Sequence, residues 1–248
     1  MDFYDSELDI EKRSCFMFHL FKRKYVIQDL KSKWASDNDE LLAKAKKTMS
    51  MVVIDNDSQC RMDQNLIDSG YTHTARKYNI ERIPDVEPYQ IVLIDIKGIG
   101  AKCLEGSVSA KDEGLAVAAE IKRQYPSKSV IAFSALLDDY QDHYILRGLD
   151  GYFPKEEAIP KRNEKIDDCL MRQINPMIKW KSIRRELFEY DIPITKVAEL
   201  ESYFVEAVLG QKTFNEHKAS KMVDGIRQTI GIVRDLASLA SMLQTFMK

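Results

Sequence analysis

The apolar run Ile91–Ile94 (IVLI) ends in Asp95, and the apolar run Met51–Ile54 (MVVI) ends in Asp55. Runs of this length that are rich in valine and isoleucine and bounded by turn residues are typical of strands buried on both faces. We therefore expect two strands of a parallel sheet here, each with a carboxylate at its carboxyl end.

Three further segments complete the predicted sheet. The run SVIAF at residues 129–133 leads into Ser134, and GYF at residues 151–153 leads, through one proline, into Lys155. Residues 71–78 mix polar and apolar side chains, which favours an edge strand over a central one. The sequence thus predicts five strands.

Helical patterns separate most of these runs. Residues 113–125 place their apolar side chains on one face before Pro126 ends the helix, and residues 138–146 and 163–174 are further candidates. The segment between Tyr78 and Ile91 contains two prolines and predicts only a loop or a single turn. Strands that alternate with helices predict an α/β fold, with helices on both sides of a parallel sheet.

This topology brings distant polar residues to one place, because right-handed crossovers put the carboxyl ends of all strands at the same edge. Carboxylate oxygens there suit Mg²⁺, a carboxylate can act as a nucleophile toward phosphorus, and an ammonium and a hydroxyl can hold phosphate oxygens. Six side chains are expected at this edge: Asp55, Asn56, Asp57, Asp95, Ser134 and Lys155.

Four ordered motifs within residues 49–175 carry a family resemblance: VVIDND, VLIDIKG, VIAFSA and GLDGYFPK. Together they resemble the receiver domain of bacterial response regulators. The resemblance implies a flavodoxin-like, five-stranded parallel sheet. It also implies a histidine kinase or a small-molecule phosphodonor as partner, and no catalysis beyond the domain's own acceptance and hydrolysis of a phosphoryl group.

The same resemblance implies a role for each site residue. Asp95 becomes the phosphoacceptor, and Lys155 the lysine that contacts the phosphate. Ser134 becomes the switch hydroxyl and Tyr152 the switch aromatic. The implied ligands of Mg²⁺ are the acidic pocket with the acceptor and one backbone carbonyl: Asp55, Asn56, Asp57, Asp95 and the carbonyl of Lys97.

The chain departs from the family pattern at two places near the acceptor. Asn56 stands where the family usually has a second acid, which predicts weaker Mg²⁺ binding unless the loop turns Asp57 inward. The loop at residues 97–111 is longer than usual and has three glycines. Long loops in compact domains are often functional, so a lid over the phosphate and a partner contact both stay open.

Helices are expected on both sides of the receiver-like segment, in an N-terminal extension (residues 1–48) and a helical output region (residues 176–248). We expect the extension to pack on the C-terminal helices. A helix at residues 174–189 is expected to continue from the receiver, with a kink at Asn175-Pro176. Its basic residues, Lys179, Lys181, Arg184 and Arg185, are interpreted as a solvated helix face.

A long helix is predicted from Phe214 to Phe246 because apolar residues recur there with the 4-3 spacing of a coiled coil. Its seam would bury against the chain's own helices, such as residues 197–209, or form a homodimer. The predicted seam comprises Met222, Ile226, Thr229, Val233, Leu236, Ala240, Leu243 and Met247.

Bulk composition excludes several classes of protein. The chain has 37 basic and 39 acidic residues, which argues against a dedicated nucleic-acid binder. Its four cysteines include no CxxC pair, so no structural zinc site is expected. No run approaches the roughly 18 apolar residues of a membrane span. We expect a cytoplasmic protein with reduced thiols.

Three functional hypotheses follow. The first is an atypical response regulator that is phosphorylated on Asp95 with Mg²⁺ and signals to an unknown output protein through its helical region. The second is a pseudo-receiver that serves as an interaction and oligomerisation scaffold without phosphorylation. The third and weakest is a DNA-binding regulator with an unrecognised helical reader.

Overall fold

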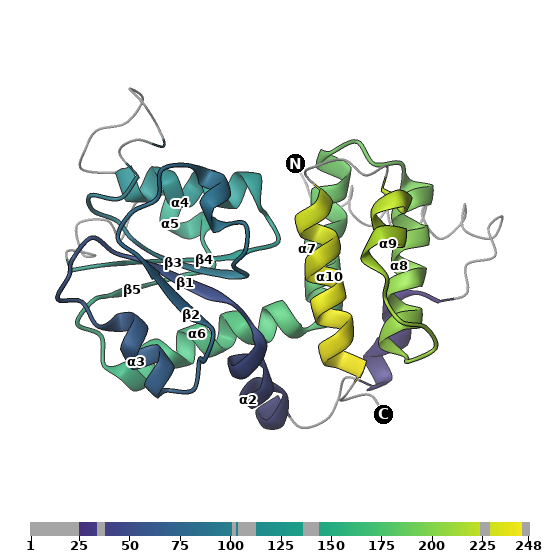
Figure 1. Cartoon of the computed structure of the whole chain (residues 1–248), viewed down its shortest axis with the longest axis horizontal. Helices are drawn as coiled ribbons and strands as arrows, with labels where there is room; N and C mark the ends of the chain where they lie inside the picture. The colour runs from purple at the N-terminus through teal and green to yellow at the C-terminus, as the bar shows by residue number, and fades with distance from the viewer. Residues whose placement is uncertain are drawn as a thin grey trace, which may run out of the picture. The chain divides into compact units, whose positions relative to one another are not determined.

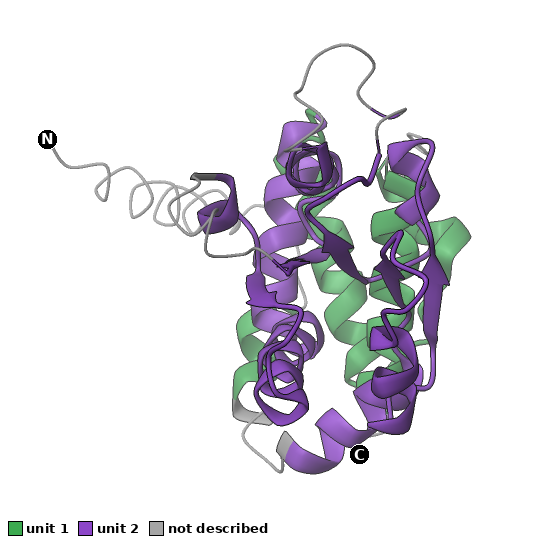
Figure 2. Cartoon of the chain, turned by 90° about the vertical axis from the view of Figure 1, so that its left-hand side faces the viewer, with its two compact units in different colours: residues 1–34, 191–248 green, residues 35–190 purple. Residues whose placement is uncertain are grey.

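The structure is a computed structural model that describes residues 25–33, 38–100, 103, 113–135, 144–223 and 229–244. The chain forms two compact units, shown in Figure 2. One unit, called the sheet unit, comprises residues 35–190, and the other, called the helical unit, comprises residues 1–34 and 191–248. The sequence placed its divisions at 48/49 and 175/176 instead.

The sheet unit is built on five parallel strands in the order β2-β1-β3-β4-β5. This order confirms the predicted flavodoxin-like α/β fold. The central strands β1, β3 and β4 are buried along their whole length, whereas the edge strand β2 is half-buried throughout. The strands are β1 Met51–Ile54, β2 Thr74–Lys77, β3 Ile91–Asp95, β4 Ser129–Ser134 and β5 Gly151–Pro154.

Helices cover both faces of this sheet, with α4 and α5 on one face and α3 and α6 on the other (Figure 1). The connection between β2 and β3 contains one 3₁₀ turn, η3, as its two prolines predicted. Residues 138–143 of the expected 138–146 helix lie outside the described residues. The helical elements are α2 Asn38–Thr48, α3 Met62–Asp68, η3 Ile83–Val86, α4 Glu113–Gln124, α5 Tyr144–Gly148, α6 Ile159–Ile174 and α7 Pro176–Glu189.

The helices α6 and α7 are separated by one extended residue, Asn175, with φ −70° and ψ 112°. A residue before proline is pushed out of the helical region, and Pro176 occupies the first position of α7, where its missing N–H costs nothing. The Asn175 side chain accepts hydrogen bonds from the amides of Met177 and Ile178. At Asn175-Pro176, where a kink was expected, the chain therefore divides into two helices.

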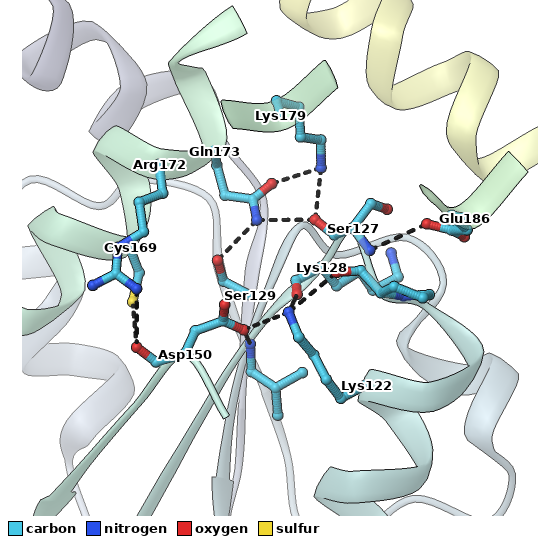
Figure 3. A network of polar contacts seen from close by, with 12 residues as sticks. Lys122, Ser127, Lys128, Ser129, Asp150, Cys169, Arg172, Gln173, Lys179 and Glu186 are labelled. Carbon is cyan, nitrogen blue, oxygen red and sulfur yellow. Dashed lines mark hydrogen bonds and ion pairs between the residues drawn. The ribbon is translucent and has the colours of Figure 1, made fainter. Parts of the chain in front are cut away.

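Polar side chains of α7 are buried at the amino-terminal edge of the sheet (Figure 3). The Lys179 ammonium donates to the carbonyl of Ser127 (2.8 Å) and to the side-chain oxygen of Gln173 (2.6 Å). Gln173 donates in turn to Ser129 Oγ at 2.8 Å, and Glu186 accepts from the amide of Ser127 at 3.1 Å. We call Ser127, Ser129, Gln173, Lys179 and Glu186 the amino-edge network.

The amino-edge network corrects the interpretation of Lys179 as part of a solvated face. Lys179 is only 4% exposed, whereas Lys181 and Arg185 are exposed. Burial of an ammonium is tolerated here because carbonyl and amide oxygens replace its water. The network fixes α7 to the start of β4, so this helix is an integral part of the sheet unit.

The helical unit consists of η2 Ile27–Lys33, α8 Ile194–Val208, α9 Glu216–Met222 and α10 Thr229–Gln244. The helices α8, α9 and α10 contact one another, and η2 contacts α8. At the start of η2 the amide of Ile27 donates to the buried Glu201 of α8 at 2.9 Å. Of the described N-terminal elements, η2 thus packs on a C-terminal helix as expected, whereas α2 contacts α6 in the sheet unit.

The prediction of one helix from Phe214 to Phe246 is wrong, because α9 ends at Met222 and contacts α10. The seam residues Thr229, Val233, Leu236, Ala240 and Leu243 are buried on α10, which packs on α8 and α9. Intramolecular packing therefore satisfies the apolar spacing that suggested a coiled coil. Ile226 and Met247 lie outside the described residues. No described helix meets the length and apolarity needed to span a membrane.

We expect the Lys179→Met substitution to lower the stability of the sheet unit. Methionine keeps the apolar stem but leaves acceptors of the amino-edge network without their charged donor, at a cost of about 1.5–3 kcal/mol. Lys181→Met changes an exposed lysine of the same helix and is expected to stay within about 0.5 kcal/mol of the wild type. Urea unfolding followed by circular dichroism measures both variants, and equal midpoints would contradict the role of Lys179.

Candidate functional site

Two acidic residues are buried next to each other at the carboxyl edge of the sheet. Asp55 directly follows β1, and Asp95 ends the neighbouring strand β3. Asp55 is 0% exposed and Asp95 is 4% exposed. The Lys155 ammonium lies 3.0 Å from Asp55 Oδ1 and 2.7 Å from Asp95 Oδ2. The structure therefore brings together three residues that the sequence places in three separate motifs.

Lys155 reaches both carboxylates because the chain holds its backbone at the adjacent strand end. Its amide donates to the carbonyl of Ser134 at 3.0 Å, directly after β5 pairs with β4. Its ammonium also lies 5.6 Å from the centre of the Phe133 ring, and that ring stacks on Phe153. The lysine is thereby fixed at one end by the sheet and at the other by two acids.

The electrostatics of this trio leave one net negative charge in a buried place. Burial raises the pKa of Asp95 and the charge of Asp55 adds to the rise, whereas the hydrogen bond and charge of Lys155 oppose it. For Lys155, burial alone lowers the pKa, but the hydrogen bonds and charges of Asp95 and Asp55 outweigh burial and raise it. The ammonium therefore stays charged and compensates only part of the acidic pocket.

One oxygen of the acidic pocket lacks a partner. Asp55 Oδ2 is buried and accepts no hydrogen bond from any described residue. Buried carboxylate oxygens are nearly always satisfied, so an unsatisfied one marks a place for water or a cation. The nearby Cys60 thiol does not supply a charge, because burial and Asp55 raise its pKa to about 11.

The pocket offers ligands that suit Mg²⁺, but too few of them to hold the ion alone. Mg²⁺ binds through one or two carboxylates together with water and phosphate oxygens, which Asp55 and Asp95 can supply with the backbone carbonyl of Lys97. The described residues contain no group of three or more His, Cys, Asp or Glu side chains that would hold a metal without a phosphate. These ligands would therefore hold Mg²⁺ only weakly, and oxygens of a phosphoryl group would complete its coordination.

Asn56 and Asp57, the other expected ligands, are engaged elsewhere. The Asn56 amide donates to the carbonyl of Gly98 at 3.3 Å. Asp57 is exposed, and its Oδ1 accepts from the amide of Gln59 at 2.9 Å in a local turn. Such turns use the Asp side chain to hold the backbone. The turn of Asp57 therefore gives no support to the idea that Asp57 compensates for Asn56.

Ser134 and Tyr152 lie on the neighbouring strands β4 and β5. Ser134 is buried and follows Phe133, the residue that pairs with Asp95. Tyr152 pairs with Ala132 and is 39% exposed. Ser134 thus lies at the edge that carries Asp95, and Tyr152 has the partial exposure that a side chain needs to change position. Their switch roles stay predictions.

Gly114, in the first turn of α4, lies against the site, a role that the sequence did not assign to it. Its amide donates to the carbonyl of Ile96 at 3.0 Å. A Cβ atom at Gly114 would lie 2.2 Å from the carbonyl oxygen of Asp95 and 2.5 Å from that of Ile96. Only glycine lets α4 approach the backbone of Asp95 so closely. A glycine in the first turn of a predicted helix was the available signal.

Comparisons with known proteins give no family assignment. No family profile matches the chain, and no curated protein matches it. Among solved structures, the receiver domain of NtrX from Brucella abortus is 22% identical, with a TM-score of 0.38, over 49% of this chain and 98% of that one.

Two longer structures are also similar to parts of the chain. NtrX from Brucella abortus in complex with ATP is 17% identical, with a TM-score of 0.39, over 65% of this chain and 35% of that one. RcsB from Salmonella enterica serovar Typhimurium, bound to a promoter, is 15% identical, with a TM-score of 0.33, over 77% of this chain and 99% of that one. At these values the likenesses support no argument about activity, and the fold rests on the strand order.

We expect Asp95→Asn to stabilise the protein at neutral pH. Because the pKa of Asp95 is raised in the folded state, its ionisation costs folding stability as the pH rises from the ordinary aspartate value through the raised one. Asparagine removes that cost, so the Tm of the variant should lie above that of the wild type at pH 7. The gain should shrink toward pH 4, where the wild-type carboxyl group is increasingly neutral.

Asp57→Asn is the matched control for this comparison, because Asp57 is exposed and asparagine preserves its turn. Its Tm should follow the wild type at every pH. Thermal unfolding of the three proteins between pH 4 and pH 8 gives the comparison. A loss of stability in Asp95→Asn at pH 7 would show that the carboxylate is net stabilising and contradict the electrostatic account.

Proposed function

We propose that the sheet unit is an atypical receiver domain of a two-component response regulator, which accepts a phosphoryl group on Asp95 in the presence of Mg²⁺. The observation that carries this proposal is the Lys155 ammonium between Asp55 and Asp95 at the carboxyl edge of the sheet. The partner is a histidine kinase or a small-molecule phosphodonor, since the chain shows no nucleotide-binding motif of its own.

The reaction needs an ionised Asp95. A carboxylate oxygen of Asp95 attacks phosphorus, a bond to the aspartyl oxygen forms, and the bond from phosphorus to the donor's nitrogen or oxygen breaks. The raised pKa of Asp95 means that acidification removes this nucleophile earlier than for an ordinary aspartate. Phosphorylation should therefore slow as the pH falls toward that pKa.

Lys155 and Ser134 hold the phosphoryl group afterward. In the unphosphorylated structure the Lys155 ammonium contacts one oxygen of each acid, and after transfer it turns to the phosphate oxygens. Asp55, Asp95 and the Lys97 carbonyl would hold Mg²⁺, which would supply positive charge to neutralise the transferred group. The freed Asp55 carboxylate, with its unsatisfied Oδ2, is then available to that ion.

A pseudo-receiver is the second candidate, and one observation favours it. Asn56 replaces an acid and donates to the carbonyl of Gly98, so it contributes no charge to the pocket. The domain would then serve as an interaction scaffold without a phosphorylation cycle. A homodimer through α10 is no longer supported by the seam residues, because they are buried within the helical unit.

Beryllofluoride binding at millimolar Mg²⁺, followed by fluorine nuclear magnetic resonance, separates the two candidates. We expect saturable binding by the wild type and none by Asp95→Ala, together with a covalent phosphoryl adduct after incubation with acetyl phosphate. Asn56→Asp should bind Mg²⁺ about tenfold more tightly, because it adds a carboxylate to the site. Absence of both beryllofluoride binding and the adduct in the wild type would favour the scaffold.

A further inference from the structure

Two segments of the sheet unit lie in contact with each other near the site. The first is the segment that follows Asp95, residues 96–100 (IKGIG), which we call the acceptor loop. The second is the connection between β2 and β3, which contains the 3₁₀ turn η3. The residue that joins them is Asn79, between β2 and η3.

Asn79 holds the end of the acceptor loop by a hydrogen bond. Its Oδ1 accepts from the amide of Gly100 at 2.8 Å and from the amide of Ile80 at 2.8 Å. Both partners are N–H donors, so the side-chain oxygen, and not the amide nitrogen, must face them. One side-chain oxygen therefore ties the acceptor loop to the β2–β3 connection.

The backbone of the loop at Gly100 has little freedom to compensate for loss of this bond. Gly100 has φ +80°, a left-handed conformation that favours glycine. A Cβ atom there would lie 2.4 Å from Cγ2 of Val117 on α4. The backbone at Gly100 thus packs closely against α4, and in this position its amide donates to Asn79.

Apolar packing fixes the same end of the loop. Ile99 is 0% exposed and belongs to one buried cluster with Ile80, Ile83 and Val86. The last three side chains come from the β2–β3 connection. This connection therefore gives the loop both an apolar anchor and, through Asn79, a polar one.

The other end of the acceptor loop lies on the site itself. The amide of Lys97 donates to Asp95 Oδ1, and Asn56 donates to the carbonyl of Gly98, both at 3.3 Å. The bond from the Gly100 amide to Asn79 is shorter, at 2.8 Å. The start of the loop is also held, because the Ile96 amide donates to the carbonyl of Phe133 at 3.1 Å. Lys97 thus lies between a restraint at Ile96 and the restraint that Asn79 supplies at Gly100.

We propose that Asn79 is a positioning residue for phosphoryl binding, whose side-chain oxygen fixes the acceptor loop and thereby the Lys97 carbonyl relative to Asp95. The inference rests on the proposed function, because a change in the position of the Lys97 carbonyl is detected through the binding of Mg²⁺ and a phosphoryl group. Asn79 contacts neither, and acts through Gly100.

Three variants test the role of the side-chain oxygen. Asn79→Ala removes it, and Asn79→Asp keeps an oxygen that can accept both hydrogen bonds. Asn65→Ala makes the same chemical change at an asparagine of α3 whose side chain makes no hydrogen bond within the described part of the chain. Two measurements are made on each full-length variant: hydrogen–deuterium exchange of the peptide covering residues 96–100, and the Kd of beryllofluoride at fixed Mg²⁺.

We expect Asn79→Ala to exchange faster in this peptide and to bind beryllofluoride about five- to tenfold more weakly, the effect of one lost hydrogen bond. Asn79→Asp should restore both values to within about twofold of the wild type, and Asn65→Ala should leave both unchanged. A merely structural role would lower Tm without a matching change in Kd, and would not be rescued selectively by aspartate.

Two results would overturn the proposal. One is unchanged exchange of residues 96–100 in Asn79→Ala, and the other is faster exchange with an unchanged Kd. Wild-type protein that binds no beryllofluoride is a different outcome, since it contradicts the proposed function. The exchange measurement, which needs no ligand, then decides by itself whether Asn79 positions the loop.

Discussion

Asp55 and Asp95 can be buried side by side because Lys155 places an ammonium between them. Two carboxylates in a place of low polarity repel each other and lose their hydration, and both effects disfavour ionisation. Lys155 offsets this cost at 3.0 Å from one acid and 2.7 Å from the other, but a single positive charge cannot neutralise two negative ones. The pocket therefore keeps a net attraction for a further cation.

The parallel sheet makes that arrangement possible and also makes it predictable. Residues 51–54, 91–94, 129–133 and 151–153 are short, apolar and bounded by turn residues, so each strand could be recognised alone. Because the strands are parallel, the polar residues that follow them must meet at one edge, whatever their separation in the chain. Hence Asp55, Asp95 and Lys155 could be placed together from sequence, although their distances could not.

Side-chain partners that depend on the position of a distant element could not be predicted. The pattern around Lys179 is that of a charged helix face, and only the position of the α4–β4 connection turns this lysine inward. The apolar spacing in α10 fits self-association as well as intramolecular packing, since periodicity defines a face but not its partner. Asn79 carried no signal at all, because its partner Gly100 belongs to a segment that departs from the family pattern.

The two edges of the sheet differ in how completely their buried polar groups are satisfied. At the amino-terminal edge, Lys122 and Lys128 each donate to backbone carbonyls, as the amino-edge network does around Ser127. At the carboxyl edge and the adjacent start of α6, by contrast, buried atoms of Asp55, Glu157 and Arg162 lack a partner among the described residues.

An unsatisfied buried polar group costs stability, so a chain selected for stability alone would pair it or replace it. Sequences that follow the rules of packing elsewhere usually break them where a ligand supplies the missing interaction. The amino-edge network pairs the buried ammonium of Lys179 with uncharged oxygens, whereas the carboxyl edge holds an incompletely neutralised acid pair. This difference between the two edges, more than any single residue, is the reason to expect chemistry at the carboxyl edge.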